Sequence, residues 1–153
     1  MEPDIAILLA AGYRAVADRL GRDMQRAGLA DMKPSYGFVI RAVAAEEPTI
    51  NRLAELLEVT KQAASRLADE VEAAGFIERV PDREDRRRLN LRLTAKGKKV
   101  RRRALATSAA MERELEAQLG PEAVAHLRAA LLALVTREGA LEDVLARRAR
   151  PVW

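Results

Sequence analysis

The chain of 153 residues contains no cysteine and a single histidine, His126. The absence of cysteine excludes disulfide bonds, thiolate zinc sites, thiol nucleophiles and cysteine redox sensors. One histidine also excludes a multi-histidine metal site within one chain, so we expect no metal and no other cofactor. Aromatic residues make up only 3% of the chain. None of them alternates with basic residues, which argues against a surface that stacks the bases of RNA or single-stranded DNA.

Long apolar runs are also absent. No run approaches the ~18 residues of a membrane-spanning helix, and the start, Met1 to Asp4, is acidic where a signal peptide is basic. The chain also has no Gly-rich phosphate loop and no carboxylates clustered as in a catalytic cleft. The length fits one domain, and 49% apolar residues suffice for a core. We therefore expect a soluble cytoplasmic domain that is neither an enzyme nor bound to a membrane.

The net charge of +4 is concentrated in one segment. Residues 76–103 contain twelve cationic and four anionic side chains, a net charge of +8, so the other residues sum to −4. A basic segment on a mildly acidic body is typical of a protein that binds a polyanion such as a nucleic acid. A solvated surface rich in arginine has the same composition, so charge alone leaves both interpretations open.

Apolar residues that recur at steps of three and four predict a mainly α-helical chain. The expected helices cover residues 4–26, 34–45, 50–57, 61–74, 95–119, 121–138 and 140–148. Their side-chain caps are expected at Asp4, at Thr49 or Asn51, at Thr60 and at Thr94. Between the fourth and fifth helices the period changes to two, which predicts strands at 76–80 and 89–93 joined by the charged residues 81–88. The two strands form a β-hairpin with a long loop.

Residues 50–76 have the pattern of a helix-turn-helix, two short helices that bury each other's apolar side chains. The inward stripe of the second helix consists of Ala64, Leu67, Ala68 and Val71. Its opposite face consists of Lys61, Gln62, Ser65, Arg66 and Asp69. In the major groove of DNA, glutamine pairs with adenine and arginine with guanine, and serine contacts a base or a phosphate. Any amphipathic helix has a polar face, but this one lies between a tight helical turn and a basic hairpin, which favours base reading.

The charged loop at 81–88 carries arginines at the tip of a two-stranded hairpin. Such a tip suits the narrow minor groove, where the negative potential of DNA is strongest. The acidic residues between the arginines either orient one of them through a charge-assisted hydrogen bond or keep the loop soluble. A helix-turn-helix followed by such a hairpin, the wing, makes a winged helix, so the predicted fold is mainly α with a small β-wing.

Several segments of the chain share a pattern with one known family. They are Pro34-Ser35-Tyr36, Lys61 to Leu67, Glu72 to Arg79, and a wing signature that reads Asp85-Arg86-Arg87, five residues, Leu93-Thr94-Ala95-Lys96-Gly97. Together they resemble the MarR family of winged-helix transcriptional regulators. The chain departs from the family pattern at Glu58, a turn position that the family often fills with glycine.

The resemblance implies a homodimer with one structural domain per chain. It divides the chain into an N-terminal dimerisation helix at 1–30, a DNA-binding winged helix at 31–96, and a long helix with C-terminal dimerisation helices at 97–153. The recognition helix is expected in the major groove, and Arg87, held by Asp85, in the minor groove, while the region near Ser35 contacts phosphate. Many members are repressors that a small aromatic or anionic ligand releases from DNA.

The complete set of expected DNA-binding residues is Ser35, Thr60, Lys61, Gln62, Ser65, Arg66, Arg83, Asp85, Arg86 and Arg87. The expected ligand-binding residues are Tyr13, Tyr36 and Phe38. A dimer is also expected from the residues themselves, because the first and last helices carry apolar stripes that a small winged-helix core cannot all cover. The alternative is that these stripes pack on each other within one subunit.

Two functions remain open from the sequence. The first is a sequence-specific regulator on double-stranded DNA, a repressor released by a small ligand, with a pseudo-palindromic operator whose half-sites lie ~10 base pairs apart. The second is an architectural or protein-interaction module that uses the same winged helix without specific operator sites.

Overall fold

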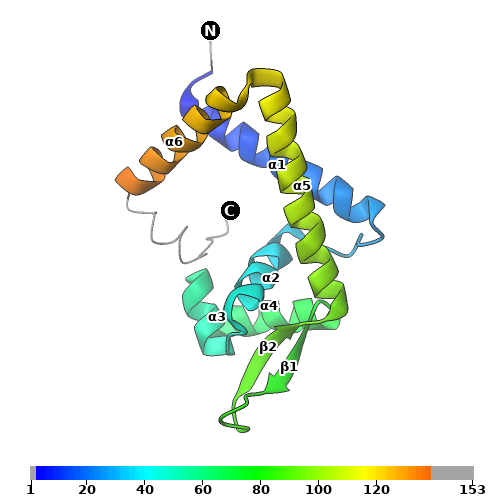
Figure 1. The fold of residues 1–153 in the computed structure, drawn as a ribbon. Coiled ribbons are helices and arrows are strands. Elements are labelled where there is room, and N and C mark those ends of the chain that lie inside the picture. The colour runs from blue at the N-terminus through cyan, green and yellow to red at the C-terminus, as the bar shows by residue number, and fades with distance from the viewer. Residues whose placement is uncertain (1–2, 139–153) are drawn as a thin grey trace.

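The computed structural model describes residues 3–138 and has the expected mainly helical architecture with one small hairpin (Figure 1). The elements are α1 (Ile5–Arg26), α2 (Pro34–Glu46), α3 (Ile50–Leu57), α4 (Lys61–Ala73), β1 (Ile77–Pro81), β2 (Leu89–Leu93), α5 (Ala95–Leu119) and α6 (Pro121–Arg137). Most bounds agree with the predicted ones, and the others differ from them by one residue. The helix predicted at 140–148 lies outside the described residues.

Threonine and aspartate side chains begin four of the helices. Asp4 accepts a hydrogen bond from the N–H of Ile7 at 2.9 Å, and Thr60 accepts one from Ala63 at 3.2 Å. Thr49, and not Asn51, caps α3, because its hydroxyl accepts the N–H of Arg52 at 3.3 Å. These hydrogen bonds satisfy N–H groups that have no partner within a helix.

The two strands form an antiparallel hairpin in which Ile77 pairs with Leu93 and Pro81 with Leu89. The first strand begins one residue later than predicted, because the N–H of Phe76 still donates to the carbonyl of Val71 and closes α4. The turn at this point needs Gly75, whose φ is +79°. The hairpin therefore follows directly from the end of α4, which places the wing beside that helix.

The core lies in the lower half of the molecule in Figure 1, where α2, α3, α4, the hairpin and the start of α5 pack together. Its largest fully buried side chains are Phe76, Leu53, Ile77, Leu91, Val39, Val43, Val71 and Val100. In the predicted inward stripe of α4, Ala64, Ala68 and Val71 are buried and Leu67 is half-buried. We call this half, α2 to β2 with the first turns of α5, the winged-helix lobe.

The start of α5 is locked to the end of α4. The hydroxyl of Thr94 donates to the carbonyl of Gly75 at 2.6 Å, and a Cβ at Gly97 would lie 2.0 Å from the carbonyl oxygen of Phe76. The ammonium of Lys96 donates to the carbonyl of Ala74 at 2.8 Å and lies 4.5 Å from the centre of the Phe76 ring. Because Gly97 has no Cβ, α5 can approach the turn at Phe76 this closely, and a residue with a Cβ could not.

Helices α1 and α6 lie at the other end of the long helix α5 (Figure 1). Polar contacts hold α1 against α5: the hydroxyl of Thr107 donates to Asp23 at 2.8 Å, and Arg19 donates to Glu114 at 2.7 Å. The hydrogen bond from Thr107 lowers the pKa of Asp23 below its ordinary value. We call α1, the C-terminal half of α5 and α6 the terminal-helix region.

Within residues 3–138 no helix is both long and apolar enough to span a membrane. The same part of the chain contains no group of three acidic or histidine side chains placed to hold a metal ion.

Candidate nucleic-acid interface

The polar face of α4 lies on the surface, as its spacing predicts. Lys61, Gln62 and Arg66 are exposed and Ser65 is half-buried, whereas Ala64 and Ala68 on the opposite side are fully buried. The helix is fixed by its core side and by the cap at Thr60, so the backbone positions from which these hydrogen-bonding side chains project are fixed. We call Lys61, Gln62, Ser65 and Arg66 the reading face.

Two aspartates shape the tip of the wing. Asp82 accepts hydrogen bonds from the N–H groups of Glu84 at 2.8 Å and Asp85 at 3.0 Å, and from the amide of Asn90 at 2.6 Å. These hydrogen bonds, first that from Asp85, lower the pKa of Asp82. Asp85 in turn accepts the N–H of Arg87 at 3.0 Å. The tip is therefore ordered by carboxylates that bind its backbone.

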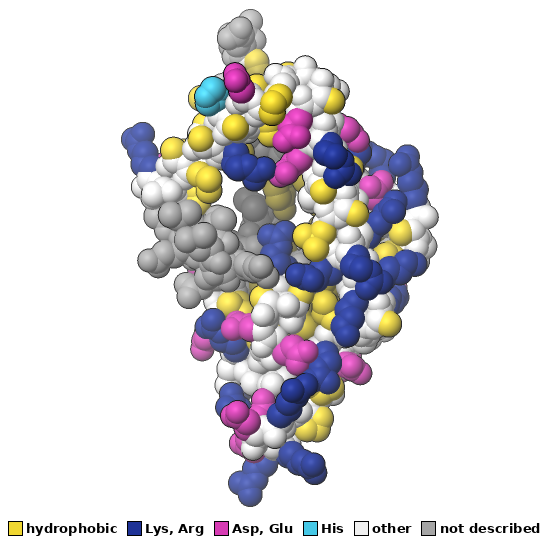
Figure 2. All heavy atoms as spheres, in the orientation of Figure 1, with side chains coloured by type: hydrophobic (Ala, Val, Ile, Leu, Met, Phe, Trp, Pro, Cys, Tyr) yellow, Lys and Arg dark blue, Asp and Glu magenta, His cyan; other side chains and the backbone are white. Residues whose placement is uncertain are grey.

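Asp85 was expected to hold Arg87, and in the structure its carboxylate accepts a hydrogen bond from the backbone N–H of Arg87. Asp85 thus shapes the turn that carries the arginine. Sequence reasoning missed the role of Asp82, although an aspartate before a polar turn is a signal for backbone capping. The arginines at the tip, Arg83, Arg86, Arg87 and Arg88, are all exposed. Figure 2 shows Lys and Arg side chains gathered at this end of the molecule.

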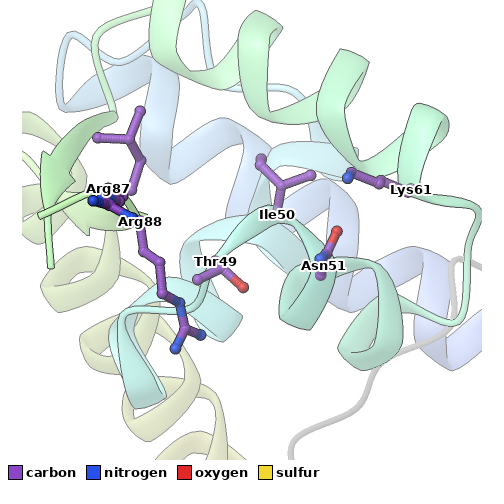
Figure 3. Close-up of a pocket in the computed structure, with 7 residues that line it drawn as sticks. Thr49, Ile50, Asn51, Lys61, Arg87 and Arg88 are labelled. Atoms are coloured by element: carbon purple, nitrogen blue, oxygen red, sulfur yellow. The ribbon is translucent and has the colours of Figure 1, made fainter. Parts of the chain in front are cut away.

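A hollow of about 340 Å³ lies between the wing and the first turns of α3 and α4. It is lined by Thr49, Ile50, Asn51, Lys61, Arg87, Arg88 and Leu89. In Figure 3 the first residues of α3 lie between Arg88 on one side and Lys61 on the other. Within the described residues, no hydrogen bond or ion pair engages the side chains of Lys61, Arg87 or Arg88.

The electrostatics of this hollow suit an anion. Three cationic side chains line it, and α3 and α4 both begin at its wall, where helix dipoles are positive. Lys61 belongs both to the hollow and to the reading face, so an anion held here would lie beside the groups that can read bases. Arg88 and Asn51 were not predicted as site residues. The basic loop is a signal for Arg88, but no sequence pattern marks Asn51.

Several cations of the basic segment are engaged within the protein. Arg79 pairs with Asp69 and Glu72, Arg92 with Glu47, and Lys96 with Asp31, while Lys99 donates to the carbonyl of Ala27. The net charge of this segment therefore overstates the cations that are available to a ligand. Asp69, predicted on the outer face of α4, is engaged by Arg79 and is separate from the reading face.

The start of α2 lies beside α4. Ser35 is half-buried in the first turn of α2. Its neighbour Lys33 lies 3.6 Å from Glu70 of α4, and the hydroxyl of Tyr36 donates to the same carboxylate at 3.5 Å. The pKa of Lys33 is raised, chiefly by its contact with Tyr36.

The three predicted ligand residues lie in different environments. Tyr36 is buried in the core, with its ring edge-on to that of Phe76 at 6.1 Å between ring centres. Tyr13 is 53% exposed on α1, and Phe38 is half-buried against the core. None of them lines the hollow described above. The ligand site at these residues stays a prediction.

Part of the chain is similar to a known protein family. Residues 30–88 match the family model described as MarR family. This range contains α2, α3, α4, β1 and the tip of the wing. None of the curated proteins compared with the chain matches it.

Solved structures match over most of the chain. YusO from Bacillus subtilis is 25% identical with a TM-score of 0.62, covering 88% of this chain and 93% of its own. FabT from Streptococcus pneumoniae, solved in complex with DNA, is 24% identical with a TM-score of 0.76, covering 92% and 96%. A DNA complex of MepR from S. aureus is 24% identical with a TM-score of 0.68, covering 87% and 96%. These proteins share the fold of the chain, terminal helices included.

Proposed function

We propose that the chain belongs to the MarR family of winged-helix regulators, whose model matches residues 30–88, and that it is a sequence-specific transcriptional regulator that binds double-stranded DNA in the cytoplasm. The observation that carries the proposal is the hollow that is lined by Lys61 of the reading face and by Arg87 and Arg88 of the wing. The similar proteins FabT and MepR were solved with DNA, which supports the same ligand for this chain.

The arrangement suits two adjacent grooves of one duplex. The reading face of α4 enters the major groove, where Gln62 and Arg66 contact base edges. The tip of the wing reaches the neighbouring minor groove with Arg87. The sugar-phosphate backbone runs between the two grooves, and the hollow between α4 and the wing receives one of its phosphates. The phosphate contacts position the protein and the contacts of Gln62 and Arg66 provide the sequence preference.

A second copy of the chain completes this proposal. Apolar side chains of the terminal-helix region are exposed in the single chain, among them Ile5, Leu8, Leu119, Leu127 and Leu132. Their exposure supports association of two chains through α1 and α6 rather than packing within one subunit. A two-fold dimer presents two reading faces, so its operator is pseudo-palindromic with half-sites ~10 base pairs apart.

We include in the proposal that the protein is a repressor released by a small aromatic or anionic ligand. The supporting contacts are those of Lys33 and Tyr36 with Glu70, which join the start of α2 to α4. A ligand that moved α2 would disturb these contacts and shift the reading face. A thermal-shift screen of phenolic and anionic metabolites tests this part, followed by release of a bound operator by each compound that raises Tm.

Selection of bound sites from random duplex DNA tests the function. We expect a palindromic consensus, and the Gln62→Ala variant should lose preference at defined positions of it. Binding to DNA without any consensus would favour the architectural module, and no binding to duplex DNA at low salt would overturn the proposed function and favour a protein-interaction module. Binding should also weaken steeply as salt rises, because phosphate contacts release counterions.

A further inference from the structure

The outer face of α4 continues beyond the reading face into two acidic residues that bind the wing. Asp69 lies one turn after Ser65, and Glu72 follows on the same side of the helix. Both carboxylates contact Arg79 of β1. Nη2 of Arg79 lies 2.6 Å from Oδ1 of Asp69, Nη1 pairs with Oε2 of Glu72, and the backbone N–H of Arg79 donates to Oε1 of Glu72 at 3.0 Å.

These three contacts attach the base of the wing to the recognition helix. The side chain of Arg79 is 24% exposed, so the pairs are partly shielded from water. Arg79 sits opposite Leu91 in the hairpin, two residues before the strand ends at Pro81. A paired β-hairpin is stiff along its length, so the direction in which the strand leaves Arg79 sets the position of the tip.

We propose that Arg79 is a positioning residue that sets the spacing between the reading face of α4 and Arg87 at the wing tip. This inference rests on the proposed function, because the spacing matters only if both elements engage one duplex. The planar guanidinium suits the task, since its rigid fork holds two carboxylates at once, whereas a lysine ammonium is a point charge on a flexible stem. A wing that moved freely would lose conformational freedom on binding DNA and weaken the complex.

A second consequence of the pairing is electrostatic. Asp69 and Glu72 lie on the side of α4 that faces the wing, and their charges would repel DNA phosphates if Arg79 were absent. Loss of affinity in a simple Arg79 variant would therefore have two explanations, misplacement of the wing and exposed negative charge. The experiment has to separate them.

A double-mutant cycle tests the positioning role, with affinity measured for a duplex that carries the selected site. Arg79→Lys keeps the charge and removes the fork. We expect it to weaken binding about tenfold in the otherwise unchanged protein and less than about twofold in the Arg87→Ala background, where no minor-groove contact is left to misplace. Equal losses in the two backgrounds would overturn the proposal, because a general structural defect does not depend on Arg87.

A neutral variant tests the electrostatic explanation. In Arg79→Gln/Asp69→Asn/Glu72→Gln the carboxylates and the fork are removed together. If Arg79 positions the wing, this triple variant stays weak, and recovery of the original affinity would show that Arg79 only masks negative charge. Thermal unfolding of every variant checks the fold, and Asp69→Asn, which keeps the pair with Glu72, replaces Arg79→Lys if that variant does not fold. Failure of the unchanged protein to bind duplex DNA would refute the proposed function, whereas additive losses in a protein that binds refute only the role of Arg79.

Discussion

The two halves of the molecule differ in how far their large apolar side chains are buried. In the winged-helix lobe, residues such as Leu53, Phe76 and Leu91 are completely buried. In the terminal-helix region, Leu127 is 47% exposed and Leu119 60% exposed. Burial of apolar surface stabilises by about 25 cal/mol per Å². The first half therefore carries its own core, whereas the described part of the second half has large apolar side chains at its surface.

The contacts that hold the two halves differ as well. Within the terminal-helix region, α1 is attached to α5 through polar groups such as Arg19, Glu114 and Asp23. Ion pairs at exposed positions contribute only ~0–1 kcal/mol each. We therefore expect a change in the core of the winged-helix lobe to unfold the chain, and a change on the terminal helices to weaken the proposed association of two chains.

The largest effect is expected from Gly97→Ala in the winged-helix lobe. The added Cβ would lie 2.0 Å from the carbonyl oxygen of Phe76, and a backbone atom cannot move aside as a flexible side chain does. We expect the free energy of unfolding to fall by about 3 kcal/mol. Chemical denaturation followed by circular dichroism measures it.

The matched control for this prediction is Gly21→Ala on α1. No heavy atom lies within 4 Å of a Cβ placed there, so the same substitution should raise helix stability by about 0.5–1 kcal/mol. Equal effects of the two changes would contradict the view that only the first glycine is held in a tight contact.

A second, smaller effect is expected from Leu131→Glu on α6. Leu131 is 37% exposed in the single chain, and a carboxylate buried without a partner at the proposed dimer interface would be unfavourable. We expect dimer association to weaken by about 2.5 kcal/mol while the fold is retained. Analytical ultracentrifugation measures the association.

Leu89→Gln on the wing is the control for the dimer. Leu89 is also exposed, at 48%, but it lies in the winged-helix lobe and lines the hollow. This variant should remain as associated as the original protein. If Leu89→Gln were monomeric, or if Leu131→Glu associated as strongly as the original protein, the view that only the terminal-helix region mediates association would be wrong.

The third prediction concerns DNA contacts within the winged-helix lobe. Arg87→Ala should weaken operator binding by about 2 kcal/mol, because it removes the proposed minor-groove contact. Lys98 is exposed on α5 outside the hollow, and Lys98→Ala should weaken all sequences alike and by less. Titration by fluorescence anisotropy against the selected duplex and a scrambled one measures both. Identical losses on the two duplexes for Arg87→Ala would argue that the wing makes only nonspecific contacts.

Most of the fold could be predicted from the sequence because its signals are local. Thr60 and Thr94 are helix caps, and Gly75 is a helix end, so the bounds of α4 and α5 follow within one residue. The alternation of Leu89 to Leu93 likewise determines the strand. Each of these signals depends on residues that are close along the chain, and tertiary packing in the winged-helix lobe does not change the local structure that they favour.

The sequence could not predict in the same way which charged side chains form ion pairs within the protein. Nothing in the sequence indicates that Arg79 binds Asp69, ten residues away, or that Lys96 binds Asp31, because these pairs depend on how helices and hairpin pack. The composition of the basic segment was therefore compatible with a nucleic-acid ligand but could not distinguish the cations that are paired within the fold from those that are exposed. Only the geometry of the hollow separates the two groups.

The smallest predicted effect concerns the turn between α3 and α4, where the sequence departs from the family pattern. Glu58 has a φ of +52°, in the left-handed region that side chains with a Cβ disfavour. Glu58→Gly relieves this strain and should raise the free energy of unfolding by about 1 kcal/mol relative to Glu58→Ala, which keeps the Cβ and loses the same side-chain contacts. Denaturant unfolding of the three proteins measures the difference, and operator affinity should be equal in the two variants because the reading face begins after Thr60. An alanine variant as stable as the glycine variant would show that the turn is unstrained, and the winged-helix lobe would then tolerate a glutamate there without penalty.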